Sequence, residues 1–167
     1  RPMFLATPGF AAIGLALWSA FLASGLAVPA VPGGPVVWHA HELVFGFGLA
    51  AVAGFVVTAV PEFTGTPAFG PRVALGITAA WFAARAAYWA SGLVGPWPAA
   101  VLETGFAASL PALLARRLMA DPERRHTGFL WGLLAMAAIV AGFHLDVLRG
   151  VAPLRWAHAG IGAMMAL

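Results

Sequence analysis

The stretch Trp38-His39-Ala40-His41-Glu42-Leu43-Val44-Phe45-Gly46 sets two imidazoles and a carboxylate at the start of a long apolar segment. Residues 43–60 carry no charge, and Pro61 follows them. These residues, with the polar turn before them, are long enough to cross about 30 Å of hydrocarbon as a helix. Ionisable groups at membrane depth are costly without partners, so the rest of the chain is expected to supply those partners.

The composition is that of an integral membrane protein. Hydrophobic residues make up 62% of the chain and charged residues 9%, and the mean hydropathy is +0.90; a soluble domain does not have this balance. The formal net charge of +3 comes from arginines spread along apolar segments, which predicts no nucleic-acid surface. The absence of cysteine excludes disulfides, thiolate metal sites and covalently attached c-type haem.

Apolar segments separated by proline and glycine predict an all-α bundle of about six transmembrane helices, formed by residues 1–167 as a single domain. The first segment is too long for the core of a cleavable signal peptide and is taken as a retained helix. The predicted helices cover residues 10–28, 36–60, 72–94, 99–115, 127–148 and 154–167.

Arginine distribution predicts the orientation of this bundle. With six alternating crossings, one side carries Arg1, Arg72, Arg116, Arg117, Arg124 and Arg125. The other side carries Arg149, with Arg155 just inside the adjoining helix. Because arginine is enriched in cytoplasmic loops, both termini are expected in the cytoplasm.

Four of the five histidines fall at one depth in this topology. At 1.5 Å per residue, they and two glutamates lie in one layer within roughly 6 Å of the outer helix ends. These residues are His39, His41, His144 and His158, with Glu42 and Glu103. Arg85 lies about 13 Å below the outer end of its helix, toward the midplane. Neutral imidazole binds haem iron and copper, so the layer indicates a cofactor site.

Each of these residues also has a purely structural interpretation. A histidine near a helix end is often a hydrogen-bonded interfacial group, and Arg85 with Glu42 or Glu103 can form a structural buried ion pair. His39 and His41 are about 160° apart on a helix, so they are not expected to point into one pocket. The aromatic face around Arg85 is either packing or a wall for an anionic cofactor; it comprises Trp81, Arg85, Tyr88 and Trp89.

The organising stretch resembles the hallmark of the NnrS family, which comprises bacterial membrane proteins described as containing haem and copper and tied to nitric oxide metabolism. The resemblance continues through Ala53-Gly54-Phe55, Thr58-Ala59-Val60-Pro61 and Thr64-Gly65, with Arg1-Pro2 and Phe143-His144 fitting the same pattern. Typical members are longer, which makes this chain similar to their first half. They also have Met in place of Leu43 and Asn-Trp in place of Glu62-Phe63.

The resemblance implies a multi-pass protein of the bacterial cytoplasmic membrane. It also implies that the protein binds haem, with copper as a possible second cofactor, and acts in nitric oxide metabolism or defence against nitrosative stress. His41 and His144 rank first as metal ligands, His39 next and His158 last, with Glu42, Glu103 or Asp146 as hydrogen-bond acceptors. Two other functions remain open. One is a cofactor-free accessory subunit of a nitric oxide reductase or respiratory oxidase; the other is a small transporter or proton conduit using Glu42, Arg85 and Glu103. A second copy of the chain is a further candidate partner. Catalysis is not predicted.

Overall fold

One continuous helical segment, residues Gly34–Phe63, forms the central rod of the computed structural model, which describes residues 2–120 and 125–167. It comprises α2 (Gly34–His41), the π-helix η1 (Glu42–Gly48) and α3 (Leu49–Phe63). Pro35 lies in its first turn, where no intrahelical N–H bond is lost. The organising stretch therefore crosses from α2 into η1.

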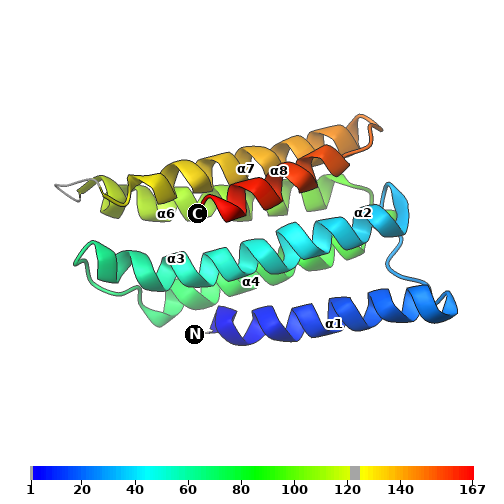
Figure 1. Ribbon diagram of the computed structural model, residues 1–167, viewed down its shortest axis with the longest axis horizontal. Helices are drawn as coiled ribbons and strands as arrows, with labels where there is room; N and C mark the ends of the chain where they lie inside the picture. Colours follow the sequence, from blue (N-terminus) through cyan, green and yellow to red (C-terminus); the bar gives the residue numbers. More distant parts are fainter. Residues whose placement is uncertain (1, 121–124) are drawn as a thin grey trace.

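Five further long helices and one short one surround this rod (Figure 1). They are α1 (Pro2–Ser24), α4 (Pro71–Trp89), α5 (Ser91–Val94), α6 (Trp97–Ala120), α7 (Thr127–Leu148) and α8 (Leu154–Met165). The described residues contain no strand, which confirms the predicted all-α class. The long helices run along one common direction, and the two chain ends lie toward the same end of the bundle (Figure 1).

Among the described residues, four helical segments are long and apolar enough to cross a membrane. They are Pro2–Ser24, Gly34–Phe63, Trp97–Ala120 and Thr127–Leu148. The other two long helices are α4, which carries Arg85, and α8, which has 12 residues. The outward faces carry large apolar side chains such as Leu15, Leu22 and Trp131. The protein is therefore a helical membrane protein in contact with lipid.

Small residues let the helices approach closely. A Cβ on Gly46 would lie 2.8 Å from the Phe10 ring, and one on Gly54 would lie 3.4 Å from Met3 Cβ, so α1 packs against the stripe of small residues on η1 and α3. The stripe comprises Gly46, Ala50 and Gly54, which lie four residues apart and therefore on one helix face. On the opposite side α6 packs on α4 and α7, and α8 packs on α7 and η1.

Several predicted helix boundaries are wrong, for local reasons. The first helix begins at Pro2 instead of near residue 10, because Pro8 removes only one hydrogen bond close to its start. It ends at Ser24, where Gly25 adopts a positive φ of 70°. The helix predicted over 72–94 is interrupted at Ala90, and a Cβ on Gly92 would lie 2.2 Å from the Ala30 carbonyl oxygen. The connector before α2 thus packs directly on α5.

Two other helices extend beyond their predicted ends. Pro61 lies within α3, which continues to Phe63, and α6 continues from Trp97 to Ala120. The charged loop that follows α6 falls partly on residues 121–124, and Arg1 and Arg124 of the predicted topology lie outside the described residues.

The contact between α8 and η1 gives a test of the packing. A Cβ on Gly160 would lie 2.6 Å from Val44 Cγ1 and 3.1 Å from the Phe45 ring, both buried, whereas a Cβ on Gly162 would meet nothing within 4 Å. Gly160→Ala is expected to lower unfolding stability by about 1–3 kcal/mol through overpacking, with Gly162→Ala neutral or slightly stabilising. Thermal unfolding in detergent measures both, and equal midpoints for the two variants would contradict this packing.

Candidate functional site

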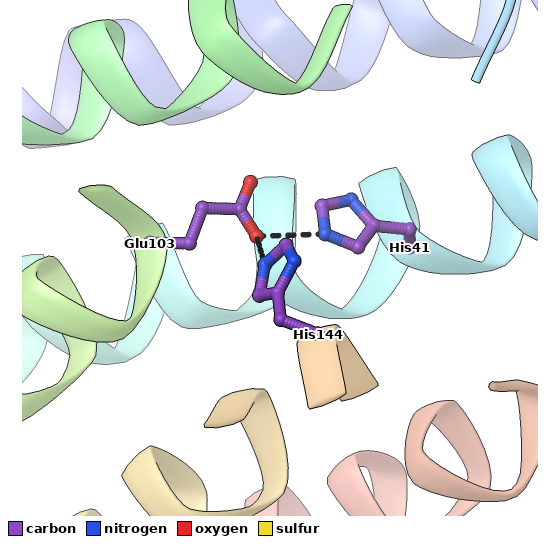
Figure 2. A group of neighbouring side chains, drawn as sticks. All are labelled: His41, Glu103 and His144. Carbon is purple, nitrogen blue, oxygen red and sulfur yellow. Dashed lines mark hydrogen bonds and ion pairs between the residues drawn. The ribbon is translucent and has the colours of Figure 1, made fainter. Parts of the chain in front are cut away.

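Two histidines and a glutamate converge from three helices at one point in the bundle (Figure 2). Glu103 Oε2 lies 2.8 Å from His41 Nε2 and 2.7 Å from His144 Nε2. His41 is on α2, Glu103 on α6 and His144 on α7, and all three side chains are buried. One carboxylate oxygen therefore bridges two imidazoles that are far apart in the sequence.

Arg85 joins this cluster to a second carboxylate. Its Nη1 donates to Glu42 Oε1 at 2.9 Å, and its Nη2 donates to Glu103 Oε1. The predicted buried ion pair of Arg85 is thus confirmed with both glutamates. The sequence placed Arg85 deeper than the histidines, but α4 ends at Trp89 instead of Val94. Arg85 is therefore one turn from the end of its helix and reaches the same layer.

Both ring nitrogens of His41 face carboxylate oxygens. Nε2 faces Glu103, and Nδ1 lies 3.0 Å from Glu42 Oε1. A carboxylate oxygen accepts hydrogen bonds, and a neutral imidazole carries only one N–H. Nδ1 also lies 3.4 Å from Arg85 Nη1, which can only donate. A neutral His41 can therefore donate from Nε2 to Glu103 and accept at Nδ1 from Arg85, or donate from Nδ1 to Glu42.

Aromatic rings enclose His41. The Tyr88 ring stacks on its imidazole, with centroids 3.5 Å apart and planes at 18°, and the Phe143 ring lies 4.8 Å away. Trp81, two turns before Tyr88, donates from Nε1 to the Gly46 carbonyl oxygen at 2.9 Å. The aromatic face of α4 therefore packs against the organising stretch, which was one of its two predicted roles.

The π-helix η1 was not foreseen from the sequence. Its wider turn begins at Glu42, directly after His41, and contains Gly46 and Gly48. π-helical turns are rare and are frequent at functional sites. The pair of glycines, Gly46 and Gly48, within an apolar segment was the only hint of an unusual turn that the sequence offered. Phe10 and Met164 approach these two positions so closely that a side chain would not fit there.

His39 and His158 lie outside the cluster. The His39 imidazole stacks on Trp18 of α1, with centroids 4.2 Å apart and planes at 6°, in keeping with the predicted opposite directions of His39 and His41. His158 is exposed, and its Nδ1 lies 3.0 Å from the Leu154 carbonyl oxygen of its own helix.

Asp146 was predicted as a possible hydrogen-bond acceptor for a histidine, and this is wrong. Its carboxylate accepts from Arg155 Nη2 at 2.9 Å and from Trp156 Nε1 at 2.8 Å, both on α8. Asp146 therefore ties α7 to α8. Glu103 was predicted as a cofactor-binding residue and hydrogen-bond acceptor, and not as a metal ligand. Its carboxylate lies with both imidazoles in a group that could hold a metal ion.

The comparison with protein families decides the assignment. The family model described as NnrS protein matches residues 1–167, the whole chain. The chain belongs to the NnrS family. Searches of curated proteins and of solved structures gave no match. Membership confirms the resemblance carried by the organising stretch and makes the chain an NnrS protein linked to nitric oxide metabolism.

The buried cluster of this NnrS protein fits a single metal ion. One ligand atom from each of His41, Glu103 and His144 lies within 4.8 Å of the other two. The Nδ1 of His41 faces Glu42, which matches the usual arrangement in which a ligating imidazole donates its second N–H to a carboxylate. Two imidazoles and one carboxylate are donors that iron and copper accept.

A haem does not fit inside this part of the bundle. Both Nε2 atoms point at one carboxylate oxygen (Figure 2), and both histidines are buried. The cavity that Glu42 lines has a volume of about 180 Å³. A cavity of about 150 Å³ holds a single benzene ring, so a porphyrin, which has four pyrrole rings, is too large for it.

The Arg85 ion pairs give a test of the site's structural role. The substitution Glu103→Gln leaves Arg85 with one carboxylate partner. The neutral amide has one oxygen, so it cannot accept from the guanidinium and face both imidazoles as the charged carboxylate does. Losing one partner of a buried ion pair costs about 3–5 kcal/mol. Glu62→Gln, at an exposed position, should change stability by less than about 0.5 kcal/mol. Denaturant unfolding in mixed micelles with a chelator measures both; equal stabilities would show that the network does not hold the helices together.

Proposed function

We propose that this NnrS protein holds a copper ion at His41, Glu103 and His144 and acts through it in nitric oxide metabolism. The observation that carries the proposal is the meeting of three donor atoms from three helices in a buried position. These donor atoms are costly to bury without partners, and a bound cation would give His41, Glu103 and His144 a common partner, while Arg85 pairs with both glutamates.

Charge and donor type favour copper. Two carboxylates and one guanidinium leave one negative charge in the cluster if both histidines are neutral. A cuprous ion neutralises this charge, whereas a divalent ion would leave a positive charge in a medium of low dielectric. Imidazole is also a donor that suits copper. When bound, copper supplies one-electron chemistry.

The surrounding residues orient the donors. Glu42 accepts from His41 Nδ1, which directs Nε2 toward the centre of the cluster. Arg85 occupies Glu103 Oε1 and leaves Oε2 facing the two imidazoles. Tyr88 and Phe143 cover His41 and exclude water from it.

Haem binding, which the family resemblance implies, is proposed on the outside of the bundle. His158 is exposed to lipid and places its Nδ1 against the Leu154 carbonyl oxygen. This contact leaves Nε2 as the nitrogen available to a haem iron. His39 is the second candidate, since its ring is only partly buried beside Trp18.

The candidate partners and the two alternative functions, an accessory subunit and a proton conduit, can be told apart by experiment. A nitric oxide reductase, a respiratory oxidase or a second copy would cover exposed apolar faces such as that of α1. A preparation with neither copper nor haem would favour the accessory-subunit function. A proton leak that depends on Glu42, Arg85 and Glu103 would favour the conduit.

Metal analysis of purified protein tests the copper site. We expect copper near one equivalent in the parent and in His39→Ala, and at least a tenfold loss in His41→Ala and His144→Ala, because a third of the donors is removed. The optical spectrum of the same samples tests haem: His158→Ala should lose a Soret band and keep copper. Equal copper in the parent and His144→Ala would refute the copper site, and iron in its place would reassign the metal.

We also propose that the protein lies in the bacterial cytoplasmic membrane with both termini in the cytoplasm. The chain contains no cysteine, so single cysteines can report the orientation without further changes. Ala152 and Arg116 are exposed at opposite ends of the bundle. In intact cells an impermeant maleimide should label Ala152→Cys and spare Arg116→Cys; the reverse pattern would invert the topology.

A further inference from the structure

A second candidate site lies between α1 and the central rod, and Glu42 is one of the residues that line it. It is a cavity of about 180 Å³. Its lining includes aromatic rings and one glycine. The lining residues used below are Phe10, Gly14, Trp38, His39, Glu42 and Phe47.

Two of the residues that line this cavity each have a buried polar side-chain atom without a hydrogen-bond partner among the described residues. They are Trp38 Nε1, a donor, and Glu42 Oε2, an acceptor. Trp38 is fully buried and Glu42 is 4% exposed. The two residues are four apart on one helix and therefore lie on the same face. An unsatisfied buried donor or acceptor is costly, so a molecule bearing both functions would be held there.

The cavity opens toward lipid. Leu15 on α1 and Leu43 on η1 line it and are 64% and 52% exposed on the outside of the bundle. An occupant must therefore be apolar over most of its surface and soluble in the membrane. Its polar end must combine a hydrogen-bond donor for Glu42 with an acceptor for Trp38.

The volume and the walls restrict the occupant further. A cavity of about 150 Å³ takes one benzene ring, so this one takes a single substituted ring. The flat side chains of Phe10, Trp38 and Phe47 favour a flat aromatic body. A phenolic hydroxyl both donates and accepts. We propose that this cavity binds the hydroxylated ring of a membrane quinol, with one hydroxyl donating to Glu42 Oε2 and accepting from Trp38 Nε1.

The quinol site adjoins the copper site and shares Glu42 with it, but uses the other carboxylate oxygen. Glu42 uses Oε1 toward His41 and Arg85, and the quinol uses Oε2. The side-chain hydrogen bonds of the proposed copper ligands His41, Glu103 and His144 do not involve Trp38 or Gly14. Loss of quinol binding with copper retained, or the reverse, therefore separates the two proposals.

Filling the cavity provides the first test. A Cβ on Gly14 would meet nothing within 4 Å, and the same holds for Gly9, which is exposed on the same helix and does not line the cavity. Gly14→Leu thus places a side chain in the cavity, and Gly9→Leu is its matched control. Calorimetric titration of the protein in phosphatidylcholine nanodiscs with a short-chain ubiquinol analogue should show saturable binding to the parent and Gly9→Leu, and at least a tenfold loss in Gly14→Leu.

The oxidation state of the ligand provides the second test. A quinone has no hydroxyl to donate to Glu42, so the parent should bind the quinol about tenfold or more tightly than the quinone. Glu42→Gln should abolish this preference, because an amide can also donate to a carbonyl. Trp38→Phe should weaken both forms alike. Absence of saturable quinol binding to the parent, equal binding by Gly14→Leu, or no preference for the quinol would each overturn the proposal. If phospholipid competes equally, the cavity is a lipid site and the proposal also fails.

Discussion

The double ion pair of Arg85 with Glu42 and Glu103 is the interaction on which the rest of the site depends. It joins the central rod, α4 and α6 below the surface of a membrane bundle, where an unpaired charge is very costly. By holding one oxygen of each carboxylate, it determines what the remaining oxygens can do. Glu103 Oε2 faces two imidazoles, whereas Glu42 Oε2 has no hydrogen-bond partner among the described residues, and Glu42 lines the cavity beside α1.

Packing around this network explains the local shape of the helices. Tyr88 stacks on His41, and Trp81 donates to the Gly46 carbonyl oxygen, so α4 contacts the rod directly before η1 and within it. Glycines allow α1 and α8 to approach the same segment closely. Asp146 fixes α8 to α7 by bonds to Arg155 and Trp156.

Much of this arrangement could be predicted from the sequence. Apolar segment lengths predicted the all-α membrane bundle, and inferred depth brought His41, Glu103 and His144 into one layer. Helical periodicity separated His39 from His41. Depth alone could not separate His158 from the cluster, because a residue's direction around its helix depends on tertiary packing. The π-helix, the break at Ala90 and the use of Asp146 by α8 also depend on contacts between segments distant in the chain.

The central claim is that His41, Glu103 and His144 bind one metal ion together. X-ray absorption at the copper edge of the loaded protein tests it most directly, because it reports the donor atoms. The account predicts nitrogen and oxygen donors with the multiple-scattering signature of two imidazoles in the parent and of one in His144→Ala, at reduced copper content. Sulfur donors from methionine, or an unchanged imidazole signature in His144→Ala, would contradict it.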